Sequence, residues 1–342
     1  MTLIDETRAL ITASRQGQPI GPRMSTCARA VGPATAEQRN QALALLAPEF
    51  EQGMPSHLAL WAGSLVEHGA DASLVAQPFA TAIGSILAEA AAAVPPLPAG
   101  AEPNLEALSA KHPDLVRALQ LIEAFWRPFI AVLGASQRCR GACKGSLAAA
   151  QRLAPLSHGG LWLAKMLEVL DDEKLLVIAP LERRGFAVTF SAVAGNYELF
   201  TRLMDVLHGD PSQGWLEGSR PSAQAMAALG KAASDGSPPM VSGSWNHYGW
   251  RALPQIAKEG REAQVDLAHW IYGEGSPTEI PLFEGTRVLV LGPPLFNGAE
   301  LVRHWPAGRT FQTLGGSVAV QQQLAPEAVA SLMQRAAQAP HS

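Results

Sequence analysis

One segment, residues 175–207, constrains the fold more than any other part of the chain. It opens with an apolar run of strand type over residues 175–178, and a polar turn over residues 181–185 follows. Beyond the turn, three apolar residues alternate with small or polar ones: Phe186, Val188 and Phe190. Because such alternation is typical of a strand with one buried face, the two runs predict an antiparallel hairpin.

The hairpin leads into an amphipathic helix that completes a β-β-α unit. Asn196 is the predicted N-cap of this helix, and Gly209 and Pro211 mark its end. Five apolar residues at helical spacing form its inward face: Leu199, Phe200, Leu203, Met204 and Leu207. Strand and helix signals therefore occur together in the second half of the chain.

The rest of the second half mixes helix and strand signals without regular alternation. A helix capped by Ser157 opens it, and further helices are predicted over residues 222–233 and 326–337. Strands are predicted over residues 240–250, 265–272 and 287–291. Since a doubly wound sheet would require strict strand–helix alternation, we expect an α+β half with a small, partly antiparallel sheet.

Helical signals dominate the first half of the chain. Helices are predicted over residues 35–53, 57–68, 73–94, 105–133 and 136–153. Pro48 is expected to kink or shorten the first of them, and Pro113 and Pro128 to interrupt the fourth. The first 155 residues are thus expected to include a helical bundle.

The length of 342 residues is sufficient for two packed parts, because single cores rarely extend much beyond ~250 to 300 residues. The segment before Thr35 mixes Gly, Pro, Ser and Arg without sustained periodicity. The predicted organisation is a loosely ordered lead-in over 1–34, a helical bundle over 35–155 and an α+β domain over 156–342.

The charge pattern argues against nucleic-acid binding. The chain carries 26 basic and 30 acidic residues, with a formal net charge of −4 and no run of five like charges. Sequence-independent binding to phosphates requires a basic patch, and the densest basic clusters are too small to form one. We therefore expect no nucleic-acid partner.

The chain also lacks the features of a secreted or membrane protein. Residues 1–10 carry acids and do not resemble a signal peptide, and the apolar stretch over residues 83–94 is shorter than the ~20 residues of a membrane span. Three cysteines, Cys27, Cys139 and Cys143, cannot all pair within one chain. These features predict a soluble cytoplasmic protein without a membrane contact.

The common catalytic motifs are incomplete. The glycine-rich segments around residues 141–146, 230–231 and 292 lack the order that a phosphate loop or a dinucleotide fingerprint requires. The segment over residues 242–246 lacks the flanking glycines of a hydrolase nucleophile elbow. Cys139 and Cys143 lie one helical turn apart, where they could bind a soft metal, but buried inert thiols are the simpler interpretation.

The richest local chemistry lies in residues 242–250. Aromatic and polar residues gather here among flexible glycines and predict a pocket wall that contacts a ligand: Trp245, Asn246, Tyr248 and Trp250. The alternative is structural, because aromatic side chains also supply much of the area of an ordinary core.

Histidines near this segment are the candidates for catalysis or metal binding. His247, His269 and Asp266 are the candidate catalytic residues, and His304 joins the two histidines as a candidate ligand of a transition metal. Asp266 and His269 share a face if their segment is helical but not if it is extended. Ordinary backbone partners of the histidines are the competing interpretation.

His158 is a further candidate ligand-binding residue in the segment Ser-His-Gly-Gly over residues 157–160. At a helix N-terminus, the helix dipole favours a neutral imidazole that can contact a ligand. The competing interpretation is that this side chain only supports the local turn.

Two functions of different class stay open. The first is an intracellular binding or interaction protein that presents a surface of its helical half to a protein partner. The second is a metal-assisted or general acid–base enzyme that uses the histidines and tryptophans of the second half. Because no catalytic motif is complete, we expect the first.

Overall fold

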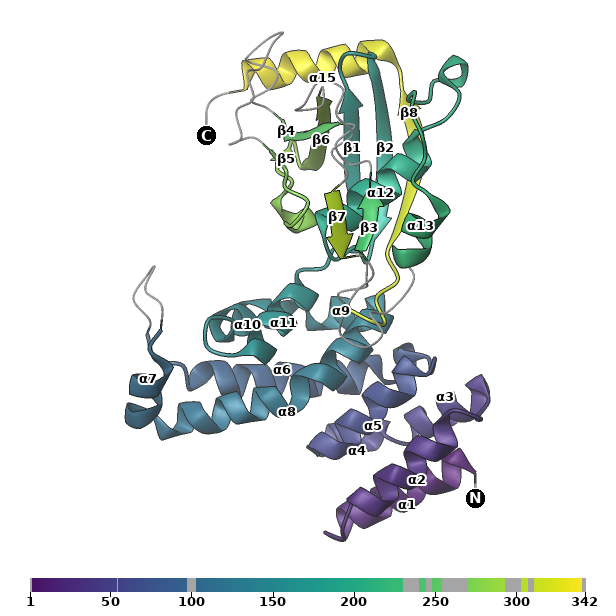
Figure 1. Cartoon of the computed structure of the whole chain (residues 1–342). Coiled ribbons are helices and arrows are strands. Elements are labelled where there is room, and N and C mark those ends of the chain that lie inside the picture. Colours follow the sequence, from purple (N-terminus) through teal and green to yellow (C-terminus); the bar gives the residue numbers. More distant parts are fainter. Residues whose placement is uncertain are drawn as a thin grey trace. The chain divides into compact units, whose positions relative to one another are not determined.

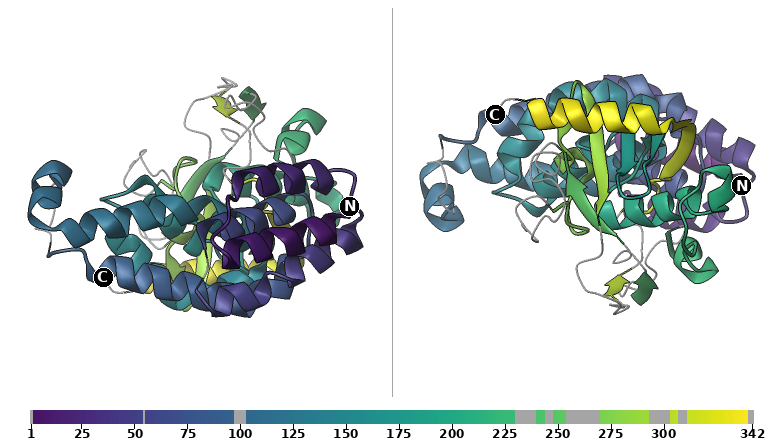
Figure 2. Two further views of the ribbon diagram at one scale, coloured as in Figure 1. Left: turned by 90° about the horizontal axis from the view of Figure 1, so that it is seen from below. Right: turned by 90° about the horizontal axis from the view of Figure 1, so that it is seen from above.

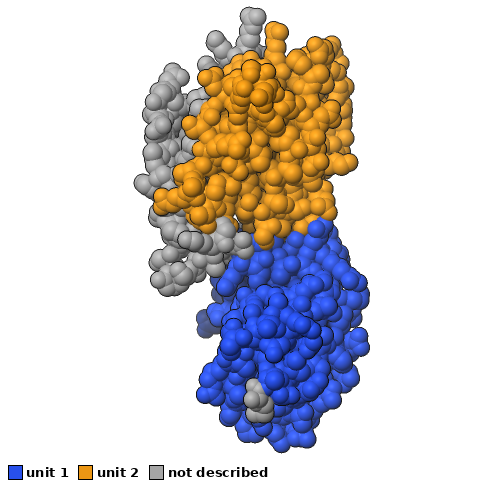
Figure 3. All heavy atoms as spheres, turned by 90° about the vertical axis from the view of Figure 1, so that its right-hand side faces the viewer, with its two compact units in different colours: residues 1–168, 311–314 blue, residues 169–310, 315–342 orange. Residues whose placement is uncertain are grey.

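The structure of the protein is a computed structural model. It describes residues 2–53, 55–96, 103–229, 240–243, 248–253, 270–292, 303–306 and 311–339. The chain divides into two compact units (Figure 3). Unit 1 comprises Met1–Glu168 and Phe311–Leu314, and unit 2 comprises Val169–Thr310 and Gly315–Ser342. Helices form the N-terminal part, and a six-stranded mixed sheet lies in the C-terminal half, so the predicted α+β class is confirmed.

Unit 1 is helical. Its described elements are α1 (Leu3–Arg15), α2 (Gly21–Val31), α3 (Ala36–Ala44), α4 (Ala47–Glu51), α5 (Ser56–Glu67), η1 (Ala72–Val75), α6 (Ala76–Ala92), α7 (Leu105–Lys111), α8 (Pro113–Ala135), α9 (Gln137–Cys143), η2 (Lys144–Ser146), α10 (Leu147–Leu153) and α11 (His158–Leu167).

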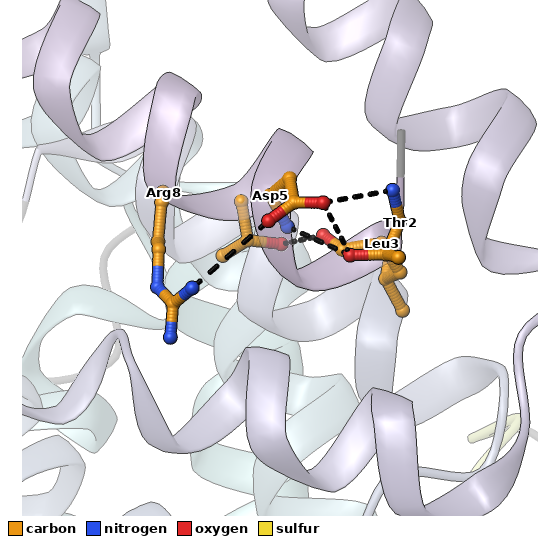
Figure 4. Close-up of polar contacts among 5 residues, drawn as sticks. Thr2, Leu3, Asp5 and Arg8 are labelled. Carbon is orange, nitrogen blue, oxygen red and sulfur yellow. Dashed lines mark hydrogen bonds and ion pairs between the residues drawn. The ribbon is translucent and has the colours of Figure 1, made fainter.

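Residues 1–34 are not a loosely ordered lead-in. They form α1 and α2, which lie side by side (Figures 1 and 2). Thr2 and Asp5 close a capping box at the start of α1, and Figure 4 shows Arg8 beside the same carboxylate. The prediction was wrong because it took glycine and proline as breakers, whereas Pro22 lies in the first turn of α2, where proline is tolerated.

Aromatic contacts hold the centre of unit 1. Phe79 of α6 lies edge-on to Phe129 of α8, with 5.4 Å between ring centroids. Gly63 lets α5 approach α8 closely, since a Cβ there would lie 2.9 Å from the Cα of Pro128. Pro128 does not interrupt the helix as predicted, because α8 continues from Pro113 through Ala135.

The boundary between the units follows α11 rather than preceding it. The predicted boundary was at residue 155, but α11 packs on α8 and α10 and belongs to unit 1. The segment Phe311–Leu314 returns to the same unit, where the Thr313 hydroxyl donates a hydrogen bond of 2.7 Å to the Ala131 carbonyl. Unit 1 is therefore built from two separate parts of the chain.

Two helical stretches of unit 1, Ala72–Ala92 and Pro113–Ala135, are long and apolar enough to cross a membrane by length and composition. Core helices of soluble proteins pass the same test. Ile83 and Phe129, one in each stretch, are fully buried among other helices of the unit. The two helices are thus weak support for a membrane span, and the expected absence of a membrane contact stays a prediction.

Unit 2 combines a mixed sheet with helices. Its described elements are β1 (Glu173–Ala179), β2 (Arg184–Ser191), α12 (Asn196–Leu207), η3 (Pro211–Gln213), α13 (Ala223–Leu229), β3 (Met240–Gly243), β4 (Gly249–Ala252), η6 (Pro277–Glu279), β5 (Leu282–Phe283), β6 (Thr286–Gly292), β7 (Arg303–Pro306), β8 (Ser317–Leu324) and α15 (Pro326–Gln338).

The main sheet has the strand order β4-β6-β1-β2-β8, and β5 pairs with β6 beside this path. The predicted hairpin is confirmed, since β1 and β2 pair antiparallel with Leu175 opposite Val188. β1 and β6 are parallel, whereas β4 and β8 each run antiparallel to their neighbours. β3 and β7 form a separate two-stranded sheet.

Both faces of the main sheet are covered. Alternate residues of β1, such as Leu175 and Val177, pack with α12, while Ile178 faces a second cluster that includes Val329 and Leu332 of α15. Helix α15 runs across the strand direction (Figure 1). Burial on both faces explains the uninterrupted apolar runs of β1 and β6.

Three details of unit 2 differ from the predictions. Gly195, not Asn196, is the N-cap of α12, because the fully buried Asn196 uses its amide to donate to the Tyr272 carbonyl. The strand predicted over residues 240–250 is two strands, β3 and β4, in different sheets. The strand β8 was not predicted, because its second half, Gln-Gln-Gln-Leu, shows no apolar alternation.

Candidate functional site

The first turn of α11 fixes His158, one of the predicted ligand-binding residues. Ser157 caps the helix by accepting from the Gly160 amide at 2.8 Å, and Glu123 of α8 accepts from the Gly159 amide at 2.8 Å. The Trp162 indole, one turn further on, donates to His158 Nε2 at 2.8 Å. Because Nε2 is the acceptor in this bond, the neutral imidazole carries its proton on Nδ1.

Trp126 of α8 closes this arrangement from the other side. Its ring lies edge-on to His158, with 5.2 Å between centroids, and the His158 and Trp162 rings are 5.9 Å apart. Gly159 makes the approach of the two helices possible, because a Cβ there would lie 2.8 Å from Trp126 Cδ1. Phe311 adds an edge-on contact to Trp162 at 5.7 Å.

These residues form a surface with both apolar and cationic character. His158 is exposed, and Trp126 and Trp162 are only partly buried. Arg127 lies 5.2 Å from the centroid of the Trp126 ring, and Lys165 lies 5.2 Å from that of Trp162. We call Trp126, Arg127, His158, Trp162 and Lys165 the aromatic face.

The aromatic face combines the features of a binding surface. Aromatic rings held by packing and hydrogen bonds contribute contact area with little loss of conformational entropy. The two cations attract carboxylates, and His158 Nδ1 offers a further hydrogen-bond donor. The arrangement can therefore hold an apolar side chain with an acidic group beside it.

Tyr248 and Trp250, predicted to line a pocket, belong to the core of unit 2. Trp250 is 4% exposed and stacks on Phe200, with 4.1 Å between the ring centroids. Tyr248 is 7% exposed and lies edge-on to Trp250 at 5.9 Å. These contacts are those of the structural alternative, in which aromatic side chains supply core area.

The hydroxyl of Tyr248 has a partner that the sequence analysis missed. His208, which is 1% exposed at the end of α12, lies with Nε2 3.0 Å from Tyr248 Oη and with Nδ1 2.8 Å from the Ser219 carbonyl. A carbonyl only accepts, so Nδ1 donates to it and Nε2 accepts from the hydroxyl. Burial raises the pKa of Tyr248 to about 12, which keeps this donor protonated.

The ring of His208 packs closely against a glycine. Gly218, with φ of +147°, lies where a Cβ would be 2.9 Å from His208 Cε1. A glycine so close to a histidine is consistent with a tightly packed ring, but nothing in the local pattern joins residue 208 to residue 248. The pair is therefore a product of the tertiary fold.

The other predicted site residues are not tested. Trp245, Asn246, His247, Asp266 and His269 lie outside the described residues. His304 lies in β7 opposite Ser242 of β3, and only its backbone position is described. The acid–base function of His247, Asp266 and His269 stays a prediction. The transition-metal site of His247, His269 and His304 stays a prediction as well.

Within the described part of the chain, no group of three or more His, Cys, Asp or Glu side chains could hold a metal ion. All three cysteines are free and buried. Burial raises the pKa of Cys27 to about 11, and a hydrogen bond with Cys143 together with burial holds the pKa of Cys139 well above its usual range. Because thiolates are the reactive form of cysteine, the raised pKa values disfavour Cys27 and Cys139 as nucleophiles.

Comparison with protein-family models, with curated protein sequences and with solved structures gives no match to this chain. Its function therefore has to be argued from its own residues.

Proposed function

We propose that the protein is an intracellular interaction protein whose aromatic face binds an acidic peptide segment of a protein partner. The observation that supports this proposal is the fixed but accessible group of Trp126, His158 and Trp162. An indole–imidazole hydrogen bond and edge-on ring contacts hold these side chains in place, yet none of them is buried.

The chemistry of the face favours a peptide over other occupants. Tryptophan and arginine are the residues most enriched among those that dominate the binding energy of protein interfaces. A rigid aromatic surface suits an apolar side chain, and the cations of Arg127 and Lys165 suit acidic neighbours of that side chain. The partner segment is thus expected to carry Leu, Phe or Trp next to Asp or Glu.

Selection from a random peptide library displayed on phage tests this proposal. The purified full-length protein is expected to enrich peptides with an apolar residue flanked by acids. The affinity of a synthetic peptide of the enriched sequence is then measured by fluorescence anisotropy for the wild type and for Trp162→Ala. We expect at least about a tenfold loss for this variant, because truncating an anchor residue typically costs 2 kcal/mol or more.

A matched pair of charge reversals separates the face from general electrostatics. Lys165→Glu and Lys144→Glu change the net charge equally, and both lysines are exposed in unit 1, but only Lys165 contacts the Trp162 ring. Lys165→Glu is expected to weaken peptide binding, and Lys144→Glu to leave it within about twofold of wild type. Enriched peptides without acids, or equal affinity for Trp162→Ala and the wild type, would refute the proposal.

A further inference from the structure

A buried arginine on β4 has properties that the aromatic face does not explain. Arg251 is 5% exposed, and no described residue forms a hydrogen bond with its Nε. Its neighbours in the strand, Trp250 and Ala252, both pack on the α12 side of the sheet. Because side chains of a strand alternate, the Arg251 side chain belongs to the opposite face, where Val290 lies across from it.

Trp270 lies beside this guanidinium. The two residues form an antiparallel bridge, and the guanidinium carbon of Arg251 lies 5.7 Å from the centroid of the Trp270 ring. The indole Nε1 of Trp270 is also buried and has no hydrogen-bond partner in the described part of the chain. Two unsatisfied N–H donors, one of them cationic, thus occur in a single ring–guanidinium contact.

Such an arrangement is costly unless an acceptor is bound. A guanidinium stays charged in proteins, and burial of a charge without a partner is strongly unfavourable. Among the described residues, no carboxylate forms an ion pair with Arg251. Arg140, which is also buried, shows the usual solution, since it donates to the carbonyls of Leu133 and Gly134 at 2.7 and 2.9 Å.

Gly292 allows the Arg251 side chain to pack closely against the end of β6. A Cβ at this position would lie 3.0 Å from Arg251 Nε, the atom that lacks a partner among the described residues. Gly292 ends β6, which runs parallel to β1.

We propose that Arg251 and Trp270 form a binding site for an oxyanion, the carboxylate or phosphate group of a small molecule. The Nε edge of a guanidinium presents two parallel N–H donors that match the paired oxygens of either group. The indole N–H supplies a neutral donor nearby. This site is separate from the aromatic face and gives unit 2 a function of its own.

Isothermal titration of the full-length protein with inorganic phosphate and, separately, with acetate tests this site. Both titrations are run at constant ionic strength in chloride buffer, so that general screening is the same throughout. At least one anion is expected to bind, and the one that binds more tightly identifies the group. Arg251→Met is expected to weaken this binding by about tenfold or more, because charged hydrogen bonds are removed.

The matched control is Arg183→Met, which removes the same charge from an exposed position in the turn after β1. It is expected to bind the anion within about twofold of wild type. Trp270→Phe keeps the ring and removes the N–H, and Gly292→Ala narrows the space at Nε. Both variants are expected to bind more weakly than wild type.

The outcomes decide the proposal. Anion binding that Arg251→Met loses and Arg183→Met keeps would support it. Failure of both anions to bind the wild type, or equal binding by the wild type and Arg251→Met, would overturn it. If Arg251→Met does not fold by circular dichroism, Arg251→Lys and Trp270→Phe decide, and unchanged binding by both would overturn the proposal.

Discussion

Tryptophans of the two units occupy contrasting surroundings. Trp250 in unit 2 is 4% exposed and stacks on Phe200 in nearly parallel planes, 1° apart. Trp162 in unit 1 is partly exposed, donates to His158 and contacts Lys165. The same residue type thus packs in the core of one unit and lies on a polar, accessible surface of the other.

The difference lies in the partners that surround each ring rather than in the local sequence. Trp250 lies in a segment dense in aromatic and polar residues, yet its neighbours in space are core side chains of α12. Trp162 lies in an ordinary amphipathic helix, yet the neighbouring His158 and Lys165 are both exposed. Aromatic density along the chain is therefore a poor guide to a binding surface, because exposure is set by the tertiary fold.

The largest expected effect distinguishes the two tryptophans by stability. Trp250→Ala removes a fully packed ring and is expected to lower the free energy of unfolding by about 3 to 5 kcal/mol. Trp162→Ala is expected to cost roughly half of that or less, because its ring is already in contact with solvent. Urea denaturation followed by circular dichroism gives both values.

Peptide binding should show the reverse order. Trp162→Ala is expected to lose affinity for the selected peptide, whereas Trp250→Phe, a milder change in the core, is expected to retain it. Equal stability losses for the two alanine variants would contradict the contrast between core and surface. Loss of peptide binding in Trp250→Phe with native circular dichroism would contradict it as well.

Much of the fold could be predicted from the sequence where periodicity and end signals agree. The hairpin of β1 and β2 and the helix α12 follow from apolar alternation and helical spacing, and α15 starts with a proline at its first turn. The strand β8 escaped prediction because it is held by its pairing with β2. Local pattern cannot report a strand whose stability comes from its neighbour.

The candidate sites were less predictable. His158 could be proposed from its place at a helix start, but the contact with Trp126 requires two helices to meet. The sequence did not mark Arg251 as a binding residue, because a single arginine between apolar residues is common in strands. It becomes unusual only when the fold buries its guanidinium away from water. Both sites depend on contacts between residues far apart in the chain, which is why spacing alone could not define them.

The next largest effect is expected from the pH dependence of stability, which tests the buried pair of His208 and Tyr248 in unit 2. Burial raises the pKa of Tyr248 from 10.0 to about 12, so the folded state holds this proton more tightly than the unfolded state. The resulting contribution to the free energy of unfolding is fully present below pH 10 and is lost as the pH rises to about 12. Two pKa units correspond to at most about 2 to 3 kcal/mol of unfolding free energy.

Urea denaturation of the wild type and of Tyr248→Phe between pH 9 and about 11.5 measures this effect. Other groups titrate in both proteins, so the difference between them isolates the phenol. The stability advantage of the wild type over the variant is expected to shrink above pH 10. A constant difference over this range would show that the Tyr248 hydroxyl is not held protonated by burial.

The smallest expected effect tests how the aromatic face is positioned. In Gly159→Ala, the new Cβ would lie 2.8 Å from Trp126 Cδ1, so the indole has to move. Overpacking of this kind costs roughly 1 to 3 kcal/mol, and alanine regains up to about 1 kcal/mol in a helix, so a net loss of about 1 kcal/mol is expected.

Gly141→Ala in α9 is the control, because no atom lies within 4 Å of its new Cβ, and it is expected to stabilise the protein. Urea denaturation gives the sign of each change, and a stabilising Gly159→Ala with unchanged peptide affinity would show that the contact between Trp126 and α11 does not position the face.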